Sequence, residues 1–439
     1  MPFETIPGTT ERYAHLCFDK DGRERADDPD GVNGRLSEQV LARAAQDQPT
    51  HVFIFCHGWK GDIDSSRDQY NHWIGAMLAL TEDRTAVPLP FRPLWVGLHW
   101  PSLPFGNEEL SADDARDFDV DEGTAQSPDQ IKATYLDRLD LGPEAEPLID
   151  RILRQHRQNA AAPELPEDAR QAYAELAALA GYTSDGPTGP PDAEGAPFDP
   201  DLAFARGNAA EGSDFAGGGL LGGILGPLRQ LSYWTMKKRA RTIGESGMHD
   251  FAAGLMKAAA NARVHLMGHS FGTIVVASML GGRGAAGQLP RQVDSVALLQ
   301  GAVSLWAFGA SVNGEDRPGY FHAWVKRGAI RGPLIVSQSI HDRAVGRLYP
   351  WASALSLSDA SFADELPKYG AIGRFGICGL EAAIPRAMGD TSERYRFEPG
   401  KVYNLESSKF IKDGGGLSGA HSDIDGPEVA HALWQAALV

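Results

Sequence analysis

One serine lies between two glycines at the point where an apolar run gives way to small and aliphatic residues. The stretch "VHLMGHSFGTIVVASML", residues 264–280, places Ser270 two residues from Gly268 and two from Gly272. A strand that turns directly into a helix crowds its neighbours, so the flanking residues must be small and the residue at the tip takes a strained backbone. The pattern predicts an exposed hydroxyl at a helix N-terminus, where negative charge is stabilised. A glycine-flanked turn that only packs well is the alternative.

This G-x-S-x-G arrangement, with a strand before it and a helix after it, resembles the nucleophile elbow of the α/β-hydrolase family. The resemblance covers residues 50–105 and 230–439, and it implies an acyl-ester hydrolase that needs no metal or organic cofactor. Serine is a weak nucleophile and needs a base. The family supplies it with an acid and then a histidine, in that order after the serine.

The candidate acid is Asp342, which follows the apolar run "PLIVSQSI". The family places its acid in such a loop after a strand, although a solvated loop or a helix cap would also suit an aspartate. Three rival carboxylates lie downstream of the serine. Asp359 and Asp364 belong to a more polar loop, and Glu406 ends the last apolar run.

Two histidines lie beyond Asp342, namely His421 and His431. The segment "DGPEVAHALWQAAL" predicts a terminal helix with Pro427 in its first turn, which puts His431 inside the helix in a structural or exposed role. His421 lies in the loop before this helix, where the family places its base. We therefore expect Ser270, Asp342 and His421 to form a catalytic triad. A histidine that only caps or packs the last helix is the alternative.

Two backbone N–H groups are expected to stabilise an oxyanion on the substrate. One belongs to Phe271, and the resemblance puts the other in "FCHGWKG", with Trp59 as the donor, although the family's longer HGGG form is absent. Gly58 would let this loop approach closely, and His57 is expected to be a structural hydrogen-bonding residue rather than a second base. The residues predicted to contact substrate are Gly58, His57, His269, Leu221 and Ile224.

Short apolar runs alternate with helical or loop segments along most of the chain. They are "HVFIFC", "PLWVGLHW", "RVHLMGHS", "DSVALLQGA", "PLIVSQSI" and "KVYNLE". Continuously apolar strands joined by crossovers indicate a parallel sheet that is covered on both faces. We therefore predict an α/β protein with a mostly parallel sheet, and the resemblance implies that it is an α/β-hydrolase sheet with a large cap or lid insertion. Near the start of the chain, "YAHLCF" predicts a strand and "DKDG" a hairpin turn, because the remaining ligands of an EF-hand calcium loop are missing.

A polar, acidic insertion rich in Pro and Gly interrupts this alternation. It contains two helical periods, at 146–158 and 166–182, and a linker or disordered loop at 183–200. The chain therefore divides into the N-terminal part of the core (1–105), a partly disordered cap or lid (106–231) and the C-terminal part of the core (232–439).

An apolar and then basic stretch, residues 216–241, closes the insertion. Its glycine-rich part, "GGGLLGGILGPL", resembles the lid of a lipase and could line an acyl pocket, but such segments also pack as buried loops. Its basic part, "KKRAR", could contact anionic lipid heads as a peripheral membrane surface, but it could equally be the solvated face of a helix.

Composition narrows the range of partners. The 439 residues carry a formal net charge of −17, which disfavours nucleic acid as a partner. No run approaches the roughly 20 apolar residues of a membrane-spanning helix, and no signal peptide is recognisable. Cys17, Cys56 and Cys378 match no metal or redox spacing and favour a reduced, cytoplasmic protein. Oligomeric state is not indicated.

Two classes of function remain open. The first is a serine esterase or lipase acting on a small-molecule ester or lipid; a thioesterase, amidase, acyltransferase or phospholipase would use the same residues. The second is a hydrolase-like scaffold that only binds ligands. Such scaffolds usually lack a triad member, so three candidates in the family's order favour the enzyme.

Overall fold

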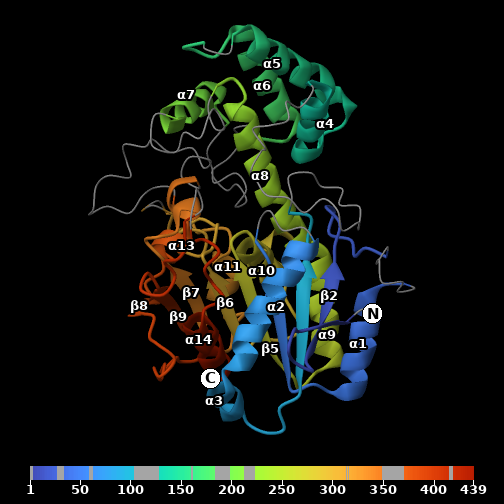
Figure 1. Ribbon diagram of the computed structural model, residues 1–439, viewed down its shortest axis with the longest axis vertical. Coiled ribbons are helices and arrows are strands. Elements are labelled where there is room, and N and C mark those ends of the chain that lie inside the picture. The colour runs from blue at the N-terminus through green and yellow to red at the C-terminus, as the bar shows by residue number, and fades with distance from the viewer. Residues whose placement is uncertain are drawn as a thin grey trace.

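The computed structural model describes residues 3–26, 34–58, 63–102, 128–159, 162–182, 198–211, 223–312, 314, 316–348, 370–414 and 419–439 (Figure 1). Within these residues, nine strands form one mixed, mostly parallel sheet, and helices cover both of its faces. This is the coarse α/β architecture that the alternating apolar runs predict.

The strands lie across the sheet in the order β1-β2-β4-β3-β5-β6-β7-β9-β8, and β1 pairs antiparallel with β2 while the other pairs are parallel. Their bounds are β1 Phe3–Thr5, β2 Arg12–Cys17, β3 His51–Cys56, β4 Pro93–His99, β5 Arg263–His269, β6 Ser295–Leu299, β7 Leu334–Gln338, β8 Ala383–Ala387 and β9 Val402–Glu406. All six quoted runs and "YAHLCF" form strands. The edge strands β1 and β8 are not predicted, because both are short and only partly buried.

The strand β3 shows why the central runs are continuously apolar. Val52, Ile54 and Cys56 belong to a hydrophobic core on one face of the sheet, whereas Phe53 and Phe55 belong to a second core on the other face. Successive side chains of a strand point to opposite faces, so a strand covered on both sides must be apolar at every position.

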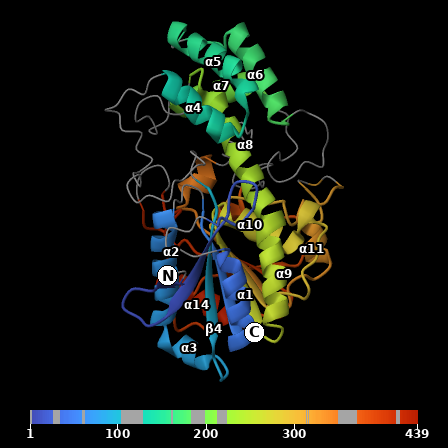
Figure 2. The same ribbon diagram turned by 90° about the vertical axis from the view of Figure 1, so that its right-hand side faces the viewer.

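Helices α1, α9, α10 and α11 cover the first face, and α2 and α14 cover the second (Figures 1 and 2). The bounds of the helices around the sheet are α1 Leu36–Asp47, α2 Ile63–Ala79, α3 Thr81–Ala86, α9 His249–Ala258, α10 Gly272–Gly281, α11 His322–Lys326, α13 Ile372–Phe375 and α14 Pro427–Ala437. The predicted terminal helix is therefore confirmed, with Pro427 at its first position.

The chain reverses its direction across the sheet between β3 and β5. After β3 it adds β4 on one side, and it then returns to place β5 on the other side of β3. Because α2 follows β3 onto one face and α10 follows β5 onto the opposite face, the two connecting loops diverge at the carboxyl ends of these strands. Open α/β sheets bind their ligands at such a point.

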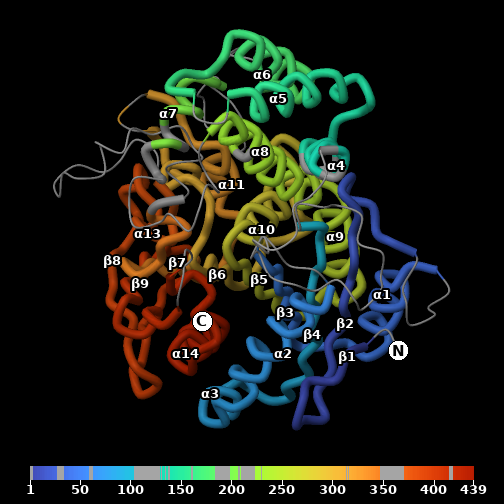
Figure 3. The backbone as a smooth tube through the Cα atoms, turned by 45° about the horizontal axis from the view of Figure 1, so that its top comes forward, coloured from blue at the N-terminus to red at the C-terminus, as the bar shows by residue number. Residues whose placement is uncertain are grey.

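A separate group of helices lies beyond the carboxyl ends of the strands (Figures 1 and 3). These are α4 Pro128–Leu139, α5 Glu146–Gln158, α6 Glu167–Leu179 and α7 Pro200–Glu211, and we call them the helical layer. The long helix α8 (Gly226–Ile243) contacts both α4 and α7 in this layer and α10 beside the sheet, and it continues through one π-helical turn, η2 (Gly244–Met248), into α9. The helices predicted at 146–158 and 166–182 are confirmed, whereas residues 183–197 of the predicted linker lie outside the described residues.

The predicted hairpin turn near the N-terminus is also present. The N–H of Gly22 donates to the carbonyl of Asp19 at 3.0 Å, and Phe18 pairs antiparallel with Glu24. Gly22 has a φ of +76°, a conformation that favours glycine.

Candidate active site

Ser270 stands at a strained turn between β5 and α10, and it is buried, so the expectation of an exposed hydroxyl is wrong. Its φ is +54°, which is costly for a residue with a Cβ. A Cβ added to Gly268 would lie 2.6 Å from the carbonyl oxygen of Gly272, and one added to Gly272 would lie 2.3 Å from the carbonyl oxygen of Cys56. Both flanking positions therefore require glycine, as the sequence pattern predicts.

The predicted base meets the serine. His421 lies in the loop between β9 and α14, and its Nε2 is 2.7 Å from Ser270 Oγ. The hydroxyl can donate to this nitrogen, because Nδ1 on the other side of the ring faces a carboxylate and must carry the ring proton. Only 13% of the His421 side chain is exposed.

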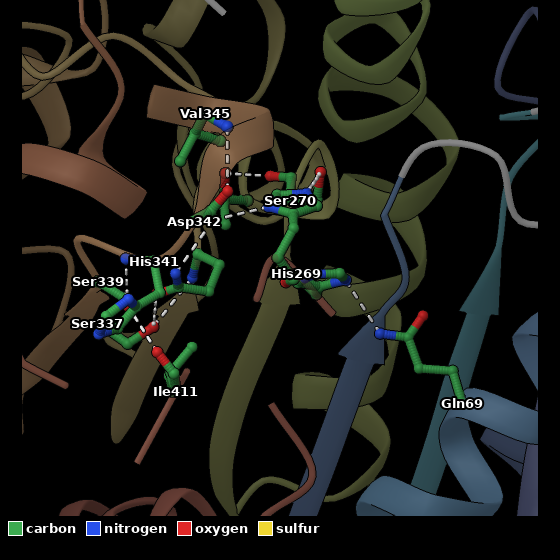
Figure 4. Close-up of polar contacts among 12 residues, drawn as sticks. Gln69, His269, Ser270, Ser337, Ser339, His341, Asp342, Val345 and Ile411 are labelled. Carbon is green, nitrogen blue, oxygen red and sulfur yellow. Dashed lines mark hydrogen bonds and ion pairs between the residues drawn. The ribbon is translucent and has the colours of Figure 1, made fainter. Parts of the chain in front are cut away.

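That carboxylate is the predicted acid. Asp342 follows β7, and its Oδ2 is 2.7 Å from His421 Nδ1, while its Oδ1 accepts from the N–H of Val345 at 3.0 Å. The loops of acid and base are joined directly, because the N–H of Ala420 donates to the carbonyl of His341 at 3.1 Å. The predicted contacts of His421 with Ser270 and with Asp342 are thus confirmed. Figure 4 shows Ser270 and Asp342 at this site.

Close approach of these two loops depends on one glycine. Gly419 has a φ of +58° and forms an antiparallel bridge with Asp342. A Cβ at this position would lie 2.4 Å from the carbonyl oxygen of His341. Glycine therefore lets the chain before His421 lie against the loop of the acid.

Two polar residues that the sequence patterns do not single out adjoin the acid. Gln300 follows β6 and donates from Nε2 to Asp342 Oδ2 at 3.0 Å. Ser337 of β7 donates from Oγ to Gln300 Oε1 at 2.9 Å. Their only sequence signal is a polar residue at or near the carboxyl end of an otherwise apolar strand, next to the expected site.

His269, predicted to contact substrate, has both ring nitrogens engaged within the protein. Its Nε2 is 2.8 Å from the backbone carbonyl of His421, and its Nδ1 is 3.1 Å from Nε2 of Gln69 on α2 (Figure 4). Burial, together with the neighbouring His421, lowers the pKa of His269 to about 3. The ring is therefore neutral near pH 7, with its proton on Nε2 facing the carbonyl.

His57 is a structural residue, as expected. Its Nδ1 is 2.9 Å from the carbonyl of Gly58, so Nδ1 carries the proton and Nε2 accepts from Nδ1 of His99 at 3.0 Å and from the N–H of Trp100 at 3.3 Å. Burial lowers its pKa well below the usual value. These contacts occupy both ring nitrogens, so neither is available to bind substrate as predicted.

The loop after β3 reaches the nucleophile through Gly58. A Cβ at Gly58 would lie 2.7 Å from the Cβ of Ser270, so glycine is required by the close approach that the sequence predicts. Trp59, the predicted second oxyanion donor, lies outside the described residues. Phe271, the first predicted donor, is the N-cap residue of α10, and its ring packs against Tyr233 of α8 with centroids 5.2 Å apart.

Of the rival acids and the second histidine, the two that the structure describes, Glu406 and His431, take no part in these contacts. Asp359 and Asp364 lie outside the described residues, and Glu406 is exposed and accepts from the N–H of Ser408 at 3.1 Å. His431 is buried in α14, where its Nδ1 is 2.6 Å from Asp83 Oδ2, which agrees with its predicted structural role.

The residues predicted for an acyl pocket are described only in part. Leu221 lies outside the described residues, as does Leu220. Ile224 is buried just before α8, and its carbonyl accepts a hydrogen bond from Tyr173 of α6. Ile224 therefore packs in the helical layer, at the end of α8 that lies away from the sheet, and its predicted contact with substrate stays a prediction.

The basic run on α8 does not form a uniformly exposed surface. Lys237 and Arg239 are buried, and Arg239 donates to the carbonyl of Pro101 at 3.2 Å, whereas Lys238 is exposed. The hydrogen bond of Arg239 joins α8 to the segment that follows β4. A lipid surface would therefore meet fewer charges here than the sequence suggests.

Three further observations concern the described part of the chain. None of its helices is both long enough and apolar enough to cross a membrane. Its histidine, cysteine and carboxylate side chains form no group of three that could hold a metal ion. Cys17, Cys56 and Cys378 are all free thiols.

The arrangement as a whole is a chain of hydrogen bonds from a buried carboxylate through an imidazole to a hydroxyl at a strained turn. Such a chain can remove the hydroxyl proton as the oxygen attacks an electrophilic carbon. Comparisons of this chain with protein-family models, curated proteins and solved structures return no match.

Proposed function

We propose that this protein is a serine hydrolase of the α/β-hydrolase type that cleaves carboxylic esters through an acyl-enzyme. The observation that carries the proposal is the hydrogen-bonded chain Asp342–His421–Ser270, with both bonds at 2.7 Å and the serine at a φ of +54°. The position of the serine also supports the proposal, because β5 ends where the strand order reverses. Open α/β sheets bind their ligands at such a point.

In the first half-reaction, Ser270 Oγ attacks the ester carbonyl carbon while its proton passes to His421 Nε2. The carbonyl oxygen becomes an oxyanion, which the N–H of Phe271 would stabilise at the N-terminus of α10. The tetrahedral intermediate then breaks its bond to the alkoxy oxygen, and the proton on His421 passes to the departing alcohol. Ser270 is left acylated.

In the second half-reaction, a water attacks the acyl carbon and gives its proton to His421. The new tetrahedral intermediate breaks the bond to Ser270 Oγ, which regains its proton from His421, and the carboxylic acid leaves. Asp342 stays ionised throughout and stabilises the imidazolium that forms in each half.

The helical layer is proposed to act as a cap over this site. The layer lies beyond the carboxyl ends of the strands, on the side from which a substrate must approach Ser270. Helix α8, which contacts both the layer and α10, would support this cap. A small-molecule ester or a lipid would then bind between the layer and the sheet.

The proposal is tested with a series of p-nitrophenyl esters of rising acyl length, assayed with the wild-type protein and the variant Ser270→Ala. Hydrolysis should be lost in Ser270→Ala and retained in Ser392→Ala, which removes a hydroxyl from an exposed loop serine. Parallel assays with thioester and amide substrates separate the esterase from the other acyl-transfer enzymes. Normal ester turnover by Ser270→Ala would refute the proposal, and no turnover by any form would favour a binding protein.

A further inference from the structure

Gln300 is held in a costly conformation beside the candidate acid. It follows β6 and is completely buried, and its φ is +44°, in the left-handed region that residues with a side chain rarely adopt. The start of α13 packs onto this backbone so closely that a Cβ at Gly373 would lie 2.6 Å from the carbonyl carbon of Gln300. Strain of this kind persists where the surrounding structure enforces it, and it clusters at functional sites.

The hydrogen bonds of its side chain leave one orientation for the amide. Ser337 Oγ accepts from the backbone N–H of Gln300 at 2.9 Å, and its single O–H donates to Gln300 Oε1 at 2.9 Å. The amide nitrogen Nε2 therefore faces Asp342 Oδ2 at 3.0 Å and donates to it. The reversed amide would place two acceptors against each other.

The carboxylate oxygen that accepts from Gln300 is also the one that binds the base. Asp342 Oδ2 accepts from both Gln300 Nε2 and His421 Nδ1, whereas Oδ1 accepts from the backbone N–H of Val345. Two donors on one oxygen fix its direction toward His421. They also share its negative charge, so the imidazolium of His421 gains less from Asp342 than it would from an oxygen with no second donor.

We propose that Gln300 is a positioning residue, which acts through Asp342 to aim the carboxylate at His421 and to keep the base from binding its proton too tightly. This inference rests on the proposed hydrolase function. Gln300 touches neither the serine hydroxyl nor the base, so it contributes no proton transfer of its own.

Removing the amide donor of Gln300 should alter the interaction of Asp342 with His421 and leave the other neighbours of His421 in place. The ring of His269 on β5 lies 5.0 Å from the His421 ring between centroids and is neutral near pH 7. Among the residues that the structure describes, the titratable and charged groups that adjoin His421 or its loop are Asp342, His341, Arg343, His269 and Asp423. Each of them is present both in the wild type and in the variants below.

The test compares Gln300→Met, which keeps the length of the side chain but cannot donate, with the wild type. Active sites are first titrated with a fluorophosphonate, so that kcat refers to reactive protein only. We expect kcat to fall about tenfold with KM within about twofold. We also expect the acid limb of the kcat/KM profile, which reports protonation of His421, to move about 0.5–1 pH unit upward. A purely structural role would lower the yield of active sites or the Tm without moving that limb.

Ser337→Ala is the second variant, and it keeps the inference testable if Gln300→Met does not fold. It leaves the donor amide of Gln300 in place but removes the hydroxyl that orients it, so the same limb should move upward by a smaller amount. An acid limb that stays in place or moves downward in a folded variant would overturn the inference, even if kcat falls. Failure of the hydrolase proposal looks different, because the wild type itself would then neither hydrolyse esters nor react with the fluorophosphonate.

Discussion

Two histidine–aspartate pairs in this protein have nearly the same geometry, but only one of them is placed to act as a base. His421 Nδ1 is 2.7 Å from Asp342 Oδ2 at the carboxyl edge of the sheet, and His431 Nδ1 is 2.6 Å from Asp83 Oδ2 between α14 and α3. Exposed fractions of the two histidine side chains are 13% and 1%. Because both histidines lie at nearly the same distance from an aspartate, contact with a carboxylate does not distinguish them.

The two histidines differ in the partner of the second ring nitrogen. Nε2 of His421 faces Ser270 Oγ at 2.7 Å, a hydroxyl that can donate, so this nitrogen is free to take a proton. Nε2 of His431 faces the carbonyl oxygen of Glu393 at 2.7 Å, which can only accept. Both ring nitrogens of His431 therefore face acceptors, and neither meets a hydroxyl from which it could take a proton. A histidine–aspartate pair becomes a candidate base only when its far nitrogen meets a donor.

The largest expected effect is on the pair that faces the hydroxyl. His421→Ala should lower kcat/KM for ester hydrolysis by about 10⁴-fold, because the serine loses its base, while the fold is retained. Steady-state kinetics together with circular dichroism check this. A loss below about tenfold would remove the distinction between the two pairs.

A pH titration tests the neutral histidine next to the base. His269 has a pKa lowered to about 3 by burial, against an ordinary value of 6.5. Between these values this histidine binds a proton in the unfolded chain but not in the folded chain, so it alone should lower the free energy of unfolding by about 1.4 kcal/mol for each unit by which the pH decreases. Denaturant unfolding between pH 7 and 4 measures the slope.

The matched control for this titration is His269→Gln, in which the titrating group is absent. Its dependence on pH should be shallower than that of the wild type by about the contribution of one such histidine. Equal slopes for the two proteins would show that His269 does not stay neutral in the folded state.

The second pair should matter for stability and not for turnover. His431→Gln leaves the buried Asp83 carboxylate without its ring N–H donor, which should lower the free energy of unfolding by about 3 kcal/mol. Asp83→Asn should act in the same direction. Chemical denaturation measures the stability, and kcat per titrated site should equal that of the wild type. A matching loss of kcat would place His431 in the site.

The smallest effect is expected at His269, which anchors the backbone of His421. His269→Ala removes the donor to the His421 carbonyl and should lower kcat about tenfold with KM little changed, because the base loses part of its support. His269→Gln retains a side-chain N–H donor and should recover most of that loss. No difference between the two variants would exclude the anchoring role.

The residues that do the proposed chemistry can be predicted from the sequence, because each follows a recognisable apolar strand. Ser270 has its glycines, Asp342 follows β7, and His421 lies before a helix that begins with proline. Parallel strands bring their carboxyl ends to one edge, so order along the chain becomes proximity in space.

The residues that support the candidate triad cannot be predicted from the sequence in the same way. Contact of Gln300 with Asp342 depends on the side-by-side placement of β6 and β7 and on a left-handed backbone at position 300. Neither feature can be predicted from the types of the residues involved. From its position beside Ser270, His269 is predicted to contact substrate. That position does not indicate that its ring instead meets the loop of His421 and helix α2. Short, partly exposed strands such as β1 and β8 likewise lack the apolar pattern that identifies the central strands.

Mapping the site of covalent modification by a fluorophosphonate tests the central claim most directly. After reaction and proteolysis, mass spectrometry should find the phosphonyl group on Ser270 alone, with stoichiometry near one per chain. Labelling should be lost in His421→Ala and retained in His431→Gln. Modification of another serine, or undiminished labelling of Ser270 in His421→Ala, would contradict the assignment of nucleophile and base.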